Sequence, residues 1–140
     1  MEEQLSIFIF NHGRFGEELI KSAELITGKI DNIQAFSLLP GMSIEDFYEK
    51  VKEPVQKKEG KKLILCDLFG GTPCNVAMMI SLQQKIDIVC GVNLPMLIDV
   101  VLSRGSGKSL DEIVKGALET GQKSVSTPEK IQRGRENGRY

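Results

Sequence analysis

The feature that most constrains the fold of this chain is a regular alternation of short apolar runs with longer amphipathic stretches. The apolar runs are typical of buried strands and lie at residues 5–10, 33–39, 62–66 and 86–92. The amphipathic stretches repeat apolar side chains at helical spacing and lie at residues 15–27, 44–58, 73–83, 95–104 and 110–120. This order predicts a doubly wound α/β fold, in which helices cover both faces of a mostly parallel four-stranded sheet.

Residue types at the expected helix ends support these boundaries. Ser43, Thr72 and Ser109 each precede an amphipathic stretch and are predicted to be N-caps, and Gly28 is a natural helix stop. Pro54 lies inside the second expected helix, so we expect that helix to bend or to end early.

The chain of 140 residues has the size of one domain. We expect this domain to extend over residues 1–127 and to end in a short fifth strand at residues 123–126. The remaining residues, 128–140, form a polar tail that is expected to be poorly ordered. The basic residues Arg133, Arg135 and Arg139 in this tail suggest no role.

Charge and composition argue against several kinds of protein. The net charge is −1, with acids and bases mixed along the chain, so we expect no nucleic-acid partner. The apolar runs reach only about ten residues, too short to span a bilayer. The acidic N-terminus is unlike a secretory signal, so the protein is expected in the cytoplasm. Three cysteines without a CxxC pair and a single histidine predict reduced, buried thiols and no metal site.

Two unusual segments that follow strands carry the candidate catalytic residues. Asn11-His12-Gly13 follows the first expected strand, and Asp67 begins the segment after the third. If these strands are neighbours, both segments lie at the carboxyl edge of the sheet, where parallel sheets place their ligands. His12 could then carry a phosphoryl group on one ring nitrogen while Asp67 holds the other. The alternative is that His12 is a capping or partly buried residue without chemistry.

The turn Gly70-Gly71-Thr72 opens the third expected helix, and backbone N–H groups at such a position bind anions. Together with Gly13, these residues are predicted to bind the phosphoryl group, although a simple tight turn would have the same composition. Neither loop has the glycine pattern of a nucleotide-binding site, so phosphoryl transfer from ATP is not expected, and we predict no cofactor.

Three large apolar residues lie close to these segments in the sequence. Phe15, Met42 and Phe69 stand in loops or at helix starts and are predicted to contact a protein partner. Core packing is the alternative for each of them.

Several blocks of sequence, taken in order, resemble the IIA domain of the mannose-type phosphotransferase system (PTS) of bacteria, the mannose/fructose/sorbose class. The resemblance covers residues 5–125. The blocks are FNHGRFGEELIKSAELITG at 10–28, LPGMS at 39–43, LILCDLFGGTPCNVA at 63–77, GVNLPMLIDVVLSR at 91–104 and ALETG at 117–121.

The resemblance implies a fold, a reaction and partners. It implies that the fifth strand is antiparallel and exchanged between the subunits of a homodimer. It also implies that His12 is phosphorylated by the carrier protein HPr, that Asp67 orients it, and that the phosphoryl group passes to a IIB subunit. IIB then phosphorylates the sugar during import through membrane IIC and IID subunits. The chain would thus be a phosphotransferase with a phosphohistidine intermediate.

Three other functions remain open from the sequence. The same fold serves as the phosphocarrier subunit of a dihydroxyacetone kinase, although the FGGTP and GVNLPML blocks favour the sugar system. A regulatory module would only signal the phosphorylation state of His12. A flavodoxin-like binder would hold a nucleotide or a flavin. The sequence does not indicate which sugar is transported.

Overall fold

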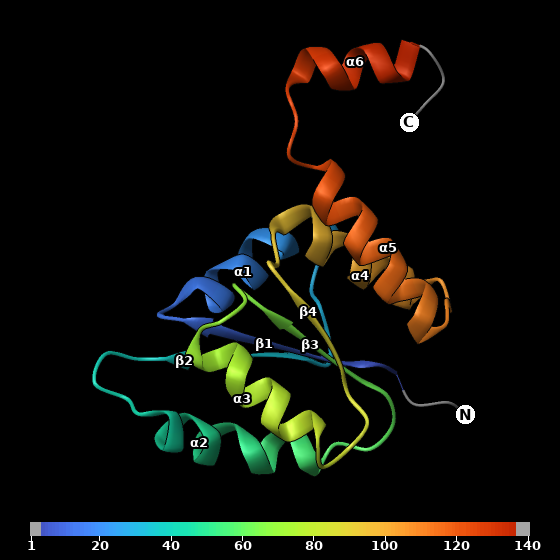
Figure 1. The fold of residues 1–140 in the computed structure, drawn as a ribbon. Helices are drawn as coiled ribbons and strands as arrows, with labels where there is room; N and C mark the ends of the chain where they lie inside the picture. The colour runs from blue at the N-terminus through green and yellow to red at the C-terminus, as the bar shows by residue number, and fades with distance from the viewer. Residues whose placement is uncertain (1–3, 137–140) are drawn as a thin grey trace.

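Four parallel strands form the centre of the molecule, in the order β2-β1-β3-β4 (Figure 1). The computed structural model describes residues 4–136. The strands are β1 (Ser6–His12), β2 (Ile33–Leu38), β3 (Lys62–Cys66) and β4 (Asp87–Cys90). The parallel four-stranded sheet predicted from the alternating pattern is confirmed.

Helices cover both faces of this sheet, as predicted. α1 (Phe15–Thr27), α4 (Leu94–Gly105) and α5 (Leu110–Lys123) lie on one face, and α2 (Ile44–Gln56) and α3 (Thr72–Ser81) lie on the other (Figure 1). Alternate side chains of the central strands enter the two cores, since successive residues of a strand point to opposite faces. Ile7, Ile9, Leu63 and Leu65 enter the α1/α4/α5 core, and Phe8, Phe10, Ile64 and Cys66 enter the α2/α3 core.

Local sequence explains most helix ends. The predicted caps Ser43 and Ser109 each accept a hydrogen bond from a backbone N–H three residues later and form capping boxes. The prediction for Thr72 was wrong: Gly71 is the N-cap of α3, Thr72 is its first helical residue, and no side chain caps the helix. Helix α2 contains Pro54 and ends at Gln56, two residues before the expected end.

The C-terminal region differs from both expectations. Lys123 still belongs to α5, and residues 124–126 form a turn, so the expected strand at 123–126 is absent from this chain. Residues of the expected disordered tail form helix α6 (Pro128–Glu136), which stands away from the sheet in Figure 1. The missed signal is Thr127, whose hydroxyl accepts the Lys130 N–H at 3.2 Å ahead of a proline at the first helical position. Arg139 lies outside the described residues.

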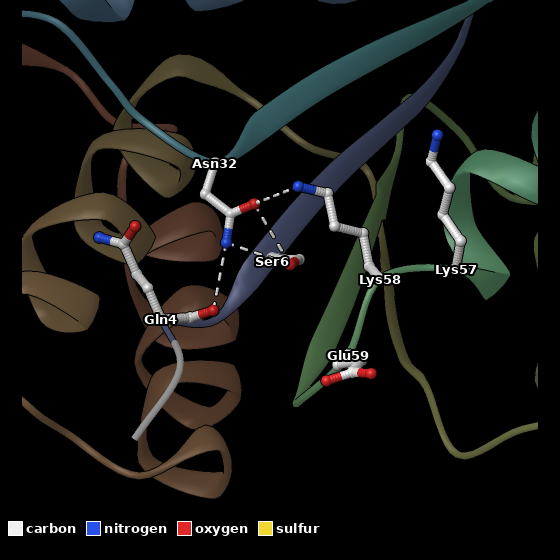
Figure 2. A pocket seen from close by; sticks show the side chains of 6 residues that line it. All are labelled: Gln4, Ser6, Asn32, Lys57, Lys58 and Glu59. Carbon is white, nitrogen blue, oxygen red and sulfur yellow. Dashed lines mark hydrogen bonds between the residues drawn. The ribbon is translucent and has the colours of Figure 1, made fainter. Parts of the chain in front are cut away.

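The edge of the sheet opposite to the candidate site is fixed by hydrogen bonds from polar and charged side chains, of which Figure 2 shows those of Asn32 and Lys58. Asn32 adopts a positive φ of 54° and donates through Nδ2 to the Gln4 carbonyl at 3.1 Å, while Lys58 Nζ donates to its Oδ1 at 3.2 Å. Arg104 donates to the carbonyls of Leu5 and Asp31 at 2.8 and 2.6 Å. These contacts anchor the start of β1. Among residues 4–136, no helix combines the length and apolarity needed to cross a membrane.

Candidate functional site

The strand order brings the two predicted segments together at the carboxyl edge of the sheet. β1 lies between β2 and β3, and its register pairs Phe10 with Cys66, so the next residues of each strand are neighbours. The Asp67 N–H donates to the Phe10 carbonyl at 3.3 Å. Here the chain leaves β1 for β2 on one side while β3 lies on the other, which makes this edge a topological switch point.

The predicted partners His12 and Asp67 are in direct contact. His12 Nδ1 lies 2.8 Å from Asp67 Oδ2, and the backbone N–H of His12 donates to the same oxygen at 2.8 Å. The second carboxylate oxygen accepts the Leu68 N–H at 2.9 Å. The imidazole is 44% exposed and the carboxylate 11%. Because an ionised carboxylate can only accept, we assign the ring proton to Nδ1, which leaves the Nε2 lone pair unprotonated.

Gly71 lies directly under the imidazole. A Cβ atom on Gly71 would come within 2.7 Å of His12 Cε1 and 3.1 Å of Nε2, so only glycine allows the ring to rest there. The preceding Gly70 has a φ of 89°, a left-handed conformation that favours glycine, and it turns the chain beneath the ring. The backbone conformation therefore explains Gly70, and the close approach of the ring explains Gly71.

The turn after β3, whose Gly71 lies against the ring, offers unused hydrogen-bond donors. Within residues 4–136, the backbone N–H groups of Gly70, Gly71 and Thr72 and the Thr72 hydroxyl make no hydrogen bond. The predicted phosphate-binding residue Gly13 differs, because its N–H donates to the Leu38 carbonyl at 2.9 Å. Gly13 instead contributes its positive φ of 58° to the bend after β1.

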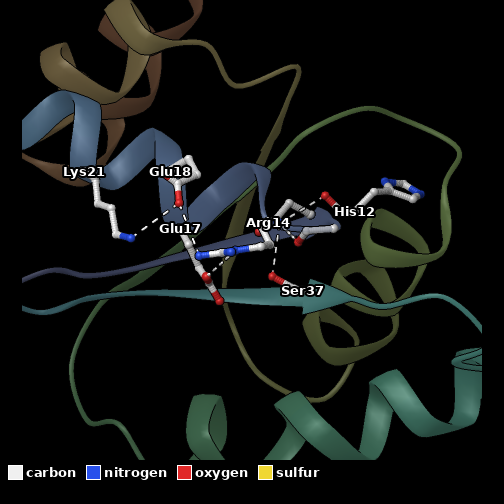
Figure 3. Close-up of polar contacts among 8 residues, drawn as sticks. His12, Arg14, Glu17, Glu18, Lys21 and Ser37 are labelled. Carbon is white, nitrogen blue, oxygen red and sulfur yellow. Dashed lines mark hydrogen bonds and ion pairs between the residues drawn. The ribbon is translucent and has the colours of Figure 1, made fainter.

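Asn11 shapes this bend, and sequence reasoning gave it no role. Its side chain is fully buried, and its Nδ2 donates to the Gly13 carbonyl at 2.9 Å and more weakly to Ser37 Oγ at 3.4 Å. A polar residue that directly follows a buried run is the signal that could have indicated it. Figure 3 shows the His12 ring projecting away from the neighbouring Arg14 and its ion-pair partners on α1.

The predicted partner-binding residues divide into two groups. Phe69 is 73% and Phe15 42% exposed, and Leu68 beside Phe69 is also exposed. Met42 is half-buried and packs against the α2/α3 core, which is the alternative considered for it. The exposed apolar side chains thus come from the start of α1 and from the turn after β3.

The three cysteines lie together, which the sequence spacing did not indicate. Cys66 ends β3, Cys90 ends β4, and Cys74 lies in the first turn of α3. Burial raises the pKa of Cys90 to about 11 and also raises the pKa of Cys66. The signal was their common position: Cys66 and Cys90 are the last residues of adjacent strands, and Cys74 lies in the first turn of the helix that follows β3.

The fold and the exposed His12, held by Asp67, define a doubly wound α/β protein with a histidine–carboxylate site at the carboxyl edge of its sheet. The chain belongs to the EIIA-man family, described as PTS system fructose IIA component, whose profile matches residues 6–118. The family resemblance inferred from the sequence blocks is confirmed.

Individual relatives agree with this assignment. The chain is similar to the mannose-specific EIIAB component of Escherichia coli, with 35% identity over 124 residues, 86% of this chain. It spans only 38% of that relative's length. It is 36% identical over 103 residues to the fructose-specific EIIA component of Bacillus subtilis, covering 71% of this chain and 70% of the relative. The crystal structure of phosphotransferase system component EIIA from Streptococcus agalactiae superposes with a TM-score of 0.82 at 29% identity, covering 90% of this chain and 98% of that one.

Proposed function

We propose that this protein is a IIA component of a mannose/fructose/sorbose-class PTS. It accepts a phosphoryl group from phospho-HPr on His12 and passes it to a IIB subunit for sugar uptake. Family membership supports the reaction class. The observation that carries the proposal for this chain is the 2.8 Å contact between His12 Nδ1 and Asp67 Oδ2, with the ring still accessible.

The proposed step is a direct transfer between nitrogen atoms. The Nε2 lone pair of His12 forms a bond to the phosphorus of phospho-HPr, while the bond from phosphorus to the donor histidine nitrogen breaks. Asp67 holds the Nδ1 proton and stabilises the positive charge that develops on the ring. The second transfer, to IIB, reverses these roles with His12 as the leaving group. The step needs no metal or cofactor.

The transferred group is expected to rest on the turn after β3. A phosphoryl group carries about 1.5 to 2 negative charges near neutral pH. The N–H groups of Gly70, Gly71 and Thr72 and the start of α3 offer donors and a positive dipole end for it. HPr and IIB would dock on apolar side chains near the site, the exposed Phe15 and Phe69 and the half-buried Met42.

We also propose that the protein works as a cytoplasmic homodimer, with residues 1–127 as the IIA domain. The family resemblance implies an exchanged antiparallel strand near residues 123–126. Support comes from the exposure of Val125 and from α6, which leaves the body of its own chain (Figure 1). Strand formation there would require a partner chain. Sedimentation of the purified protein tests this, because a monomer at working concentration would contradict it.

Phosphorylation with defined proteins tests the main proposal. Incubation with phosphoenolpyruvate, enzyme I and HPr should add one acid-labile phosphoryl group, measured by intact mass. His12→Ala should abolish the mass gain while the thermal unfolding curve stays the same, because the ring is largely outside the core. An unchanged mass of the parent protein, or persistent labelling of the variant, would remove His12 from the mechanism.

The acceptor distinguishes the remaining alternatives. A IIB protein should discharge the phosphorylated chain, whereas a dihydroxyacetone kinase partner should not. A regulatory module would take the label, and sugar uptake would not depend on His12. Visible absorbance of a bound flavin in the purified protein would favour a flavodoxin-like binder.

A further inference from the structure

Three cysteine side chains from three elements meet beside the carboxyl edge of the sheet. The Sγ atoms of Cys66, Cys74 and Cys90 all lie within 4.8 Å of one another, and those of Cys74 and Cys90 are 3.4 Å apart. The proposed phosphoryl transfer uses none of these thiols. Because the three residues come from β3, α3 and β4, the fold, and not a local motif, holds them together.

The surroundings of the cluster disfavour charge. Cys66 and Cys74 are 0% and 1% exposed, and both belong to the apolar core under α2 and α3. Burying a charge without a partner is costly in such a place. Asp67, which directly follows Cys66, would add repulsion to any negative complex. A ligand that leaves the cluster neutral therefore fits it best.

The net charge of the complex with three thiolates differs between the thiophilic ions that could bind here. Three thiolates around a divalent zinc ion leave one negative charge, and around monovalent copper they leave two. Trivalent arsenic with three thiolates is neutral. We propose that Cys66, Cys74 and Cys90 form a binding site for one trivalent arsenic atom, supplied as arsenous acid.

The binding reaction is a condensation without oxidation or reduction. Three arsenic–oxygen bonds break and three arsenic–sulfur bonds form. Each thiol proton joins one departing hydroxyl group, so three water molecules leave and no proton is released. Because each thiol proton leaves in a water molecule, binding does not change the net charge of the site, in contrast to ordinary metal binding, which releases protons from its ligands.

The sulfur positions suit a three-coordinate centre. Bonds of about 2.3 Å between a thiophilic ion and sulfur place the sulfur atoms roughly 3.4–4.0 Å apart. The Cys74–Cys90 distance of 3.4 Å already lies in this range, and the other two distances, each at most 4.8 Å, require a closure of at most about 1.4 Å. Cys90 is only half-buried and provides the side from which the ligand enters.

Native mass spectrometry of the full chain, kept reduced with a phosphine, tests the proposal. One equivalent of arsenous acid should add one arsenic atom with the loss of three hydrogens, and the thermal midpoint should rise, because the ligand binds the folded state. An adduct that retains a hydroxyl group would show two bonds and overturn the three-thiol site. Tighter binding of zinc chloride in the same titration would overturn the charge argument.

Single variants assign the ligands. Cys90→Ala and Cys74→Ala should each weaken arsenous acid binding by at least about ten-fold, because an intramolecular ligand is lost from the chelate. Met78→Ala is the control, since the Met78 thioether lies 4.0 Å from Cys74 Sγ but has no proton to give. Its affinity should equal that of the parent. Full affinity in both cysteine variants, each folded by thermal unfolding, or an equal loss in Met78→Ala would overturn the assignment.

Discussion

Replacing Gly71 with alanine should disable the site while leaving the fold intact. The backbone of Gly71 is extended, with φ −89° and ψ 167°, so alanine fits the local conformation without strain. The added Cβ, however, would lie 2.7 Å from His12 Cε1. The substitution therefore acts on the imidazole and not on the start of α3.

The size of the effect follows from the distances. Carbon atoms in contact prefer a separation of about 3.5 Å or more, so the ring must move by roughly 0.8 Å. A shift of that size away from Asp67 would lengthen the present 2.8 Å contact to a distance at which no hydrogen bond remains. Hydrogen bonds to charged groups contribute about 1.5–3 kcal/mol. If transfer depends on this bond, its rate should fall about ten- to a hundred-fold.

Two measurements test this reasoning, and a matched variant controls for it. Transfer from phospho-HPr is followed by rapid quench and intact mass, and the ring tautomer is read from nitrogen NMR shifts, which are unambiguous because His12 is the only histidine. Gly105→Ala, at the end of α4 with nothing near its Cβ position, should leave the transfer rate unchanged. A parental transfer rate in Gly71→Ala, with the Nδ1-protonated tautomer retained, would refute the argument.

The remaining predictions concern both catalysis and stability. Asp67→Ala should slow transfer about ten- to a hundred-fold in the same assay, and an unaltered rate would remove Asp67 from the mechanism. Gly16→Ala should lower the free energy of unfolding by about 1–3 kcal/mol in urea, because its Cβ would collide with the buried Asn11 Oδ1 and lie 2.8 Å from Asn11 Cγ. An unchanged urea midpoint would contradict this. Cys90, whose raised pKa of about 11 keeps it a neutral thiol below that pH, should react with iodoacetamide at pH 8 on the order of a hundred-fold more slowly than it does in the unfolded chain. Peptide mass spectrometry measures both rates, and equal rates would show an accessible thiolate.

The centre of the sheet was predictable because β1 and β3 are buried on both faces. The sequences of such strands are continuous apolar runs, and β1 is buried from Ser6 to Asn11. The C-terminal region was not predictable in the same way. Thr127 and Pro128 start a helix by local capping, whereas the family resemblance pointed to an exchanged strand, and such a strand would depend on contacts that a single chain does not contain.

The His12–Asp67 pair was predictable because strand ends are determined by the sheet. The detailed hydrogen bonding around this pair was not predictable, since it depends on where individual backbone groups point. Nothing in the sequence shows that the Gly13 N–H already donates to Leu38, or that Gly71, and not Thr72, precedes the first turn of α3. The cysteine cluster was missed for a related reason, because residues from different elements meet only after strand order and register are known.

A single carboxylate oxygen connects the strand pairing to the orientation of the reactive ring. Asp67 Oδ2 accepts both the backbone N–H and the ring N–H of His12, each at 2.8 Å, while the backbone N–H of Asp67 donates to Phe10. Any slip between β1 and β3 would therefore also move the imidazole. Because buried side chains on both faces fix that register, the ring inherits the rigidity of the sheet although it is exposed. Such a ring would present the same nitrogen to both of the proposed partners, HPr and IIB.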